Sequence, residues 1–141
     1  MQSFRKLIVW EKAHQLTLDI YSMTRDFPNA EMYGLTSQLR RASSSVPTNL
    51  AEGSGKLSDL DFRKYVSTAF GSAHEVEYLL LLSSELSYIQ EQDFIKLNNQ
   101  VEEVKRMLAG LINSLTKKIY TKTICITILI LGTLSMLMTL N

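Results

Sequence analysis

Hydrophobic residues recur at alternating steps of three and four along most of the chain, which is the spacing of one face of an α-helix. This pattern covers residues 9–27, 35–46, 62–80 and 94–115. Pro28 is expected to end the first of these segments, because the residue before a proline is pushed out of the α region. The predicted core positions are Val9, Ala13, Leu16, Ile20, Met23, Phe27, Leu35, Leu39, Ala42, Val46, Phe62, Val66, Ala69, Ala73, Val76, Leu80, Phe94, Leu97, Val101, Val104, Leu108, Leu111 and Leu115.

Residues that favour helix ends lie between these segments. The second helix is expected to begin near Glu31, whose negative charge suits a helix N-terminus. Gly53 and Gly55 are expected to end it, since glycine favours the conformation that follows a helix. Ser58 is the predicted N-cap of the third helix, and Asp61 forms a capping-box-like pair with it.

The third helix is expected to reach about Tyr88, and residues 90–93 are expected to form the turn before the fourth. No alternating strand pattern competes with these helices. Helices joined by short connections pack as antiparallel neighbours. The sequence therefore predicts an all-α protein, an antiparallel four-helix bundle with an apolar C-terminal tail.

Pro47 lies inside the second helical pattern. A proline there removes a donor and displaces the carbonyl of Ser43, at a cost of roughly 3 kcal/mol. The hydroxyls of residues 43–45 could satisfy the freed backbone groups. Two interpretations stay open: a kink with a packing or partner role, or a helix break followed by one extra turn.

The end of the chain differs from the rest, because residues 123–141 carry no charge. As a helix, residues 123–141 would span about 28 Å, which is marginal for a bilayer. The residues before them fit a positive, aromatic-edged anchor; these are Lys117, Lys118, Tyr120 and Lys122. We divide the chain into a bundle, residues 1–118, and a tail, residues 119–141. The tail is a membrane anchor, a continuation of helix four buried in an oligomer, or an extension with no evolved role.

Composition narrows the class of protein. Hydrophobic residues make up 45% of the chain and charged residues 21%, which is typical of a folded globular protein. A single cysteine, Cys125, excludes an internal disulfide framework and a cysteine-rich zinc site. Residues 1–10 lack the apolar stretch of a signal peptide, so we expect a cytoplasmic bundle.

The net charge is only +1, but the charges are unevenly distributed. Residues 74–103 hold seven acids and one base, whereas residues 104–122 hold five bases and no acid. Such blocks are usually solvated helix faces. The middle of the chain holds a candidate site for nucleic acid or a partner, on consecutive helices and the loop between them: Arg40, Arg41, Lys56, Arg63 and Lys64, set against Glu52, Asp59 and Asp61.

Exposed aromatic rings next to basic residues could stack on bases. Tyr33 and Tyr65 are the candidates, but we expect both in the core. Surplus apolar residues on the third helix, by contrast, predict an oligomer interface; these are Tyr78, Leu79, Leu81 and Leu82.

No motif indicates catalysis. Glu11 and His14 have the spacing of a di-iron ligand pair, but that architecture needs a second pair and two more glutamates. Residues 53–56 resemble part of a phosphate-binding loop, but Leu50 and Leu57 stand where glycine and a hydroxyl residue are required. We therefore expect no enzyme activity, no cofactor and no metal.

Two stretches carry a family resemblance. They are Phe4-Arg5-Lys6-Leu7-Ile8-Val9-Trp10-Glu11-Lys12-Ala13, and residues 33–42 leading into Ser45-Val46-Pro47-Thr48-Asn49-Leu50-Ala51-Glu52-Gly53. Over residues 4–118 the chain resembles the four-helix-bundle proteins named after the intervening sequences of 23S ribosomal RNA genes. The accessory variability protein of diversity-generating retroelements is similar.

The resemblance implies an up-down bundle that assembles into a ring-like homopentamer without enzyme activity. In the retroelement relatives it also implies binding to a reverse transcriptase and to nucleic acid through a basic surface. It gives Arg40 and Arg41 as the basic pair. The signature positions are Pro47, Asn49, Glu52 and Gly53, where Asn49 and Glu52 could bond backbone groups exposed by a kink.

This chain departs from the family pattern in its balanced charge up to Lys118 and in its tail. Three functions stay open. The first is a homo-oligomer that binds RNA, DNA or a nucleic-acid enzyme. The second is a structural or protein-binding oligomer without affinity for nucleic acid, and the third is a bundle tethered to a membrane through residues 119–141.

Overall fold

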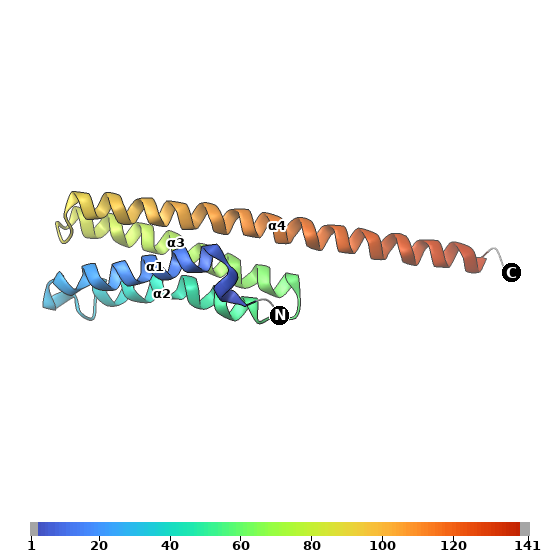
Figure 1. Ribbon diagram of the computed structural model, residues 1–141, viewed down its shortest axis with the longest axis horizontal. Helices are drawn as coiled ribbons and strands as arrows, with labels where there is room; N and C mark the ends of the chain where they lie inside the picture. The colour runs from blue at the N-terminus through green and yellow to red at the C-terminus, as the bar shows by residue number, and fades with distance from the viewer. Residues whose placement is uncertain (1–2, 139–141) are drawn as a thin grey trace.

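The computed structural model describes residues 3–138, which form four α-helices and no strand (Figure 1). The helices are α1 (Ile8–Met23), α2 (Leu35–Ser54), α3 (Asp59–Glu85) and α4 (Glu91–Met138). Short 3-10 turns lie at Phe4–Lys6, Thr24–Asp26 and Asn29–Glu31. The predicted all-α four-helix fold is confirmed.

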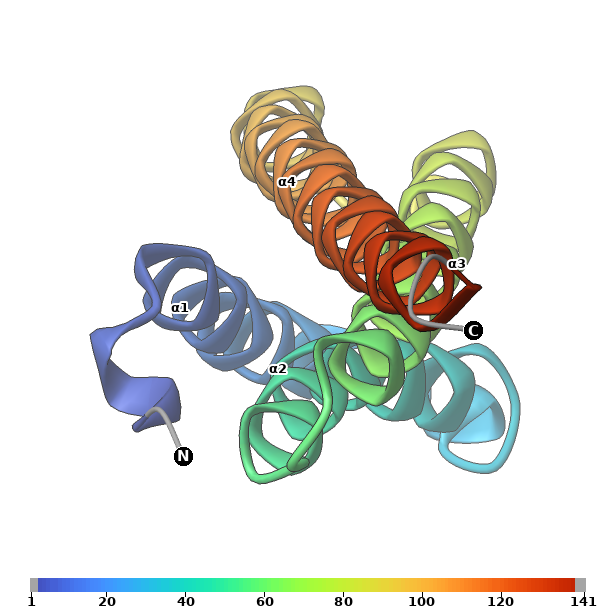
Figure 2. The same ribbon diagram turned by 90° about the vertical axis from the view of Figure 1, so that its right-hand side faces the viewer.

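Each helix of the bundle packs against two others. α1 contacts α2 and α4, and α3 contacts the same two helices. The connections α1–α2 and α3–α4 lie at one end of the bundle, and the α2–α3 turn lies at the other, near the N-terminus (Figure 1). The view along the bundle shows α1 and α3 on either side of α2 and α4 (Figure 2).

The core is built from the predicted apolar positions. Leu16, Leu39, Leu80 and Leu108, one from each helix, are fully buried. Burying such a side chain stabilises a fold by about 1.5–3 kcal/mol. The predicted positions that are only partly buried still pack against the core; they are Met23, Phe62, Phe94 and Leu111.

Two predicted boundaries of the first helices are wrong by several residues. α1 ends at Met23, before the 3-10 turn Thr24–Asp26, so Pro28 does not end it directly. α2 begins at Leu35 instead of Glu31. Glu31 nevertheless stabilises that N-terminus, because its Oε2 accepts the backbone N–H of Leu35 at 3.0 Å.

The predictions at the ends of α3 have mixed outcomes. At its start the Ser58 cap is confirmed, since the backbone N–H of Asp61 donates to Ser58 Oγ at 3.0 Å. At its other end the helix stops at Glu85, not Tyr88, and Ser87 adopts a left-handed φ of 58°. The connection between α3 and α4 therefore lies at residues 86–90 instead of 90–93.

α2 runs through Pro47 without interruption, so of the two interpretations of this proline the helix break is excluded. Tyr33 is also misplaced by the sequence prediction, because it is 93% exposed rather than buried. It lies in the turn before α2, where no neighbouring helix covers it. Tyr65 on α3 is half-buried.

α4 is 48 residues long and continues well past the other helices without a break at residue 118 (Figure 1). Ile124, Ile126 and Ile128 on this extension are more than half exposed. Within residues 3–138, no helix combines the length and the apolar character that crossing a membrane requires. The structure thus gives no support to the predicted membrane anchor, and residues 139–141 lie outside its description.

Candidate nucleic-acid interface

The signature segment of α2 is held by hydrogen bonds to both neighbouring helices. Pro47 has no N–H to give to the carbonyl of Ser43. The hydroxyl of Thr17 on α1 lies 2.9 Å from that carbonyl and 2.9 Å from the carbonyl of Ala13, so its single hydrogen can be shared between the two. The serine hydroxyls expected to do this bond other groups: Ser43 donates to the carbonyl of Arg40.

Asn49 fixes the other side of α2. Its amide donates to the carbonyl of Ser45 at 2.8 Å and to the Ser45 hydroxyl at 3.1 Å. That hydroxyl is 2.9 Å from the hydroxyl of Ser72 on α3. The Glu52 side chain is exposed and makes no hydrogen bond or ion pair in the part of the chain that the structure describes, whereas its backbone carbonyl accepts the N–H of Gly55 at 3.2 Å. The prediction that Asn49 and Glu52 bond the groups freed by Pro47 is therefore wrong, because Thr17 does so.

Gly53 allows α2 and α3 to approach closely. A Cβ at this position would lie 2.7 Å from Tyr65 Cβ and 2.9 Å from a ring carbon of Phe62, both on α3. Any other residue must push the helices apart. Three of the four signature positions, all except Glu52, thus have a structural role in packing α2 against α1 and α3.

The structure divides the five predicted basic residues into two groups. Arg40 packs onto the end of α1, where its Nε donates to Thr24 Oγ1 at 2.7 Å and its guanidinium lies 5.1 Å from the centre of the Tyr21 ring. Arg41 is exposed next to it. Arg41 and Lys56 are about 22 Å apart along the chain direction of α2, at about 1.5 Å per residue.

The second group lies around the α2–α3 turn. Lys56 Nζ is 4.8 Å from the centre of the Tyr65 ring, and Lys64 pairs with Asp61 at 3.0 Å. Arg63 is half-buried, and its Nε has no hydrogen-bond partner within residues 3–138. The five residues therefore do not form one surface.

Two lysines of α4 that the sequence did not identify as site residues join this second group. Lys118 Nζ and Lys122 Nζ of α4 bind the two carboxylate oxygens of Asp59, at 2.8 and 2.6 Å. Lys118 also lines the same cleft as Lys56, with a volume of about 320 Å³. The signal was present in the sequence, since residues 104–122 hold bases without acids and a spacing of four places Lys118 and Lys122 on one helix face.

We call this region the basic end. It consists of Lys56, Arg63, Lys64, Lys118 and Lys122. The hydrogen bonds from Lys118 and Lys122 lower the pKa of the Asp59 carboxyl below its ordinary value. Asp59 is therefore charged at neutral pH and partly neutralises the basic end.

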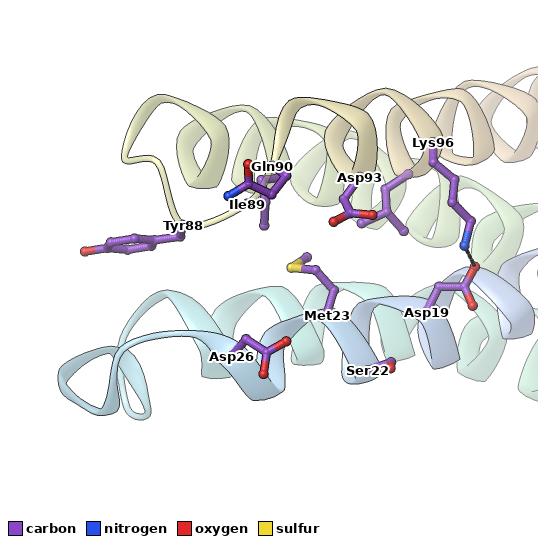
Figure 3. Close-up of a pocket in the computed structure, with 10 residues that line it drawn as sticks. Asp19, Ser22, Met23, Asp26, Tyr88, Ile89, Gln90, Asp93 and Lys96 are labelled. Atoms are coloured by element: carbon purple, nitrogen blue, oxygen red, sulfur yellow. Dashed lines mark ion pairs between the residues drawn. The ribbon is translucent and has the colours of Figure 1, made fainter.

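The opposite end carries acidic residues around a cleft of about 530 Å³ between α1 and the start of α4. We call it the acidic end. Asp19 and Asp26 of the first helical segment and Asp93 and Lys96 of α4 line this cleft (Figure 3). No group of three His, Cys, Asp or Glu residues that could hold a metal ion is found within the described part of the chain.

Asp19 is fixed by three side chains at this end. Gln15 and Gln100 donate to its carboxylate at 2.9 Å each. Lys96 Nζ lies 3.6 Å away, and Figure 3 shows this ion pair as a dashed line. Burial raises the pKa of Asp19, but these hydrogen bonds and the charge of Lys96 outweigh it and lower the pKa below its ordinary value.

The histidines take part in aromatic contacts. His14 stacks on Trp10, with ring centres 5.0 Å apart, and His74 meets the ring of Phe70 edge-on at 4.7 Å. Residues 53–56, compared above with a phosphate-binding loop, form the end of α2 and the start of the turn.

The family model for the 23S rRNA-intervening sequence protein matches residues 5–110. The chain belongs to this family. The match includes the signature segment and ends before Lys118 and Lys122, so the α4 half of the basic end lies beyond the matched residues.

One solved structure with the same fold is the crystal structure of a protein of unknown function from the S23 ribosomal protein family of Bacteroides thetaiotaomicron. The two chains share 24% sequence identity with a TM-score of 0.68, over 74% of this chain and 98% of the other. At this identity the similarity establishes the fold alone. No curated protein matches the chain.

Proposed function

We propose that this member of the 23S rRNA-intervening sequence protein family is a non-catalytic interaction protein that binds the phosphate backbone of nucleic acid through its basic end. One observation carries the proposal. Lys56 from the α2–α3 turn and Lys118 from α4 line one cleft, although they are far apart in sequence.

The arrangement suits backbone contacts rather than base recognition. Lysine ammonium groups bind phosphate as point charges, and such contacts carry no sequence information directly. The basic end has five bases, but Glu52, Asp59 and Asp61 lie among them. We therefore expect weak binding by one copy that strengthens when several copies bind the same nucleic acid.

The test is a binding titration of the full chain with structured RNA and with duplex DNA at two salt concentrations. The variant Lys118→Gln/Lys122→Gln should bind more weakly, and each lost phosphate contact should reduce the slope of log affinity against log salt by about one. Arg63→Ala/Lys64→Ala should act in the same direction.

The matched control is Lys96→Gln, which removes a lysine that also pairs with an aspartate, but at the acidic end. It should titrate like the wild type. Salt-insensitive binding, or basic-end variants that match the wild type, would contradict the proposal and favour an oligomer that binds only proteins. A reverse transcriptase is the protein partner that the resemblance to retroelement accessory proteins favours.

Self-association is the second part of the proposed function. Tyr78 and Leu81 of α3 are 62% and 45% exposed and line a groove with Phe94 of α4. Of the other two residues predicted at an interface, Leu79 is buried in the core and Leu82 is half-buried against it. The homopentamer implied by the family resemblance would cover this groove.

Light scattering on the full chain tests this assembly. We expect an oligomer for the wild type and a smaller species for Tyr78→Gln/Leu81→Gln. The control is Leu57→Gln, because Leu57 is a fully exposed apolar residue of the α2–α3 turn, away from the groove. A wild-type monomer at micromolar concentration would contradict self-association.

A further inference from the structure

A single carboxylate occupies the space between two lysines of the basic end. Asp59, at the first position of α3, accepts from Lys118 with one oxygen and from Lys122 with the other, at 2.8 and 2.6 Å. We call this arrangement the Asp59 bridge. The aspartate side chain is 19% exposed, whereas the two lysines are 57% and 62% exposed.

The Asp59 bridge presents the same chemistry that a phosphate would. Carboxylate and phosphate oxygens are both anionic acceptors for ammonium groups. Because Lys118 and Lys122 are one helical turn apart, one anion can bind both, and Asp59 already does so. A phosphate that approaches these lysines must either displace the carboxylate or bind against its negative charge.

The other two acids at the basic end differ from Asp59. The Glu52 side chain is exposed and makes no hydrogen bond or ion pair within residues 3–138, although its charge acts on Lys56 through space. Asp61 is held within α3 by Ser58 and Lys64. Only Asp59 joins two helices through the lysines that the proposed function uses.

We infer that Asp59 is a built-in counterion that competes with nucleic-acid phosphate for Lys118 and Lys122 and so limits the affinity of the basic end. This inference rests on the proposed function and deepens it. Exposed ion pairs contribute little to stability, because solvent screens them and the side chains lose freedom when they pair. The bridge can therefore open when a phosphate offers the lysines an equivalent partner.

The comparison that tests this inference uses two variants with the same change in net charge. Asp59→Asn releases both lysines, whereas Glu52→Gln removes a negative charge that acts on Lys56 through space without a hydrogen bond or ion pair. Asp59→Asn should increase the salt slope by about one and the affinity up to about tenfold near 0.1 M salt, since one added phosphate contact contributes a slope of about 0.9. Glu52→Gln should produce a clearly smaller gain.

Two further variants keep the test decisive. Asp59→Ser, which keeps a good helix-start residue, should reproduce the gain if Asp59→Asn folds poorly. Adding Lys118→Gln/Lys122→Gln to Asp59→Asn should abolish the gain, because the released lysines are then absent. Circular dichroism of each variant reports whether the bundle is folded.

These measurements distinguish a failure of the competition by Asp59 from a failure of nucleic-acid binding by the basic end. Equal gains from Asp59→Asn and Glu52→Gln, or a loss of affinity in Asp59→Asn, would overturn the competition while salt-dependent wild-type binding still supports the proposed function. The absence of salt-dependent binding in the wild type and in every variant would overturn both.

Discussion

At the acidic end of the bundle, Asp19 is held by two neutral amides and one lysine, whereas Asp59 at the basic end is held by two exposed lysines. Amides of Gln15 and Gln100 hold the Asp19 carboxylate at 2.9 Å each, and the exposed Lys96 lies farther away, at 3.6 Å. At Asp59 the two lysines are themselves the hydrogen-bond donors, at 2.8 and 2.6 Å. The same residue type therefore joins α1 to α4 mainly through amides at one end and joins α3 to α4 through two lysines at the other.

The two ends also differ in packing. At the basic end α2 and α3 approach so closely that position 53 has no room for a Cβ. At the acidic end a cleft separates α1 from the start of α4.

The largest expected effect on stability is at this close contact. Gly53→Ala should lower the free energy of unfolding by about 1–3 kcal/mol, because the new Cβ overpacks against Phe62 and Tyr65. Gly110→Ala on α4 is the matched control, since a Cβ there meets nothing within 4 Å. It should raise stability by about 0.5–1 kcal/mol through helix propensity. Urea denaturation measures both, and equal effects would contradict the account of Gly53.

Loss of the hydrogen bond from Thr17 on α1 to the carbonyl of Ser43 on α2 should have the next largest effect on stability. Thr17→Val leaves that buried carbonyl without a partner and should cost about 1–2 kcal/mol of unfolding free energy. In the Pro47→Ala background an N–H returns to satisfy the carbonyl, so Thr17→Val should cost less. A double-mutant cycle with no coupling would show that Thr17 does not compensate for Pro47.

Asp19 should give the acidic end a pH-dependent stability. Its folded pKa lies below its ordinary value of 3.8, so its contribution is complete above that value and is lost as the pH falls through the folded pKa. Asp19→Asn should therefore cost about 1 kcal/mol at neutral pH, and less below pH about 3.8. Thermal unfolding of both proteins across this range measures the difference, and a cost that does not vary with pH would argue against it.

The smallest effect on stability is expected from the α4 extension. Removing residues 119–141 should leave the bundle folded with nearly unchanged stability, because Leu115 is the last core residue of α4. The deletion also removes Lys122, so nucleic-acid binding should weaken. Circular dichroism and denaturation test the first point; a large loss of helical signal from residues 1–118 would place the extension in the core or in an oligomer interface.

The helices and their buried faces could be predicted because the apolar spacing is regular. The start of α3 could be predicted from the Ser58 cap, but the start of α2 could not, since Glu31 stabilises α2 from outside the helix through its side chain. The role of Thr17 could not be predicted, because it depends on the position of α1 against Pro47. The sequence places Lys118 among the positive residues before a possible anchor, and its proximity to Lys56 depends on where α4 passes the α2–α3 turn.

The most direct test of the account is lysine footprinting. The full chain is acetylated briefly with and without saturating structured RNA at low salt, and mass spectrometry reports the rate at each lysine. The account predicts slower acetylation of Lys56, Lys118 and Lys122 in the complex and an unchanged rate at Lys96. Protection of Lys96, or unchanged rates at the three lysines of the basic end, would contradict it.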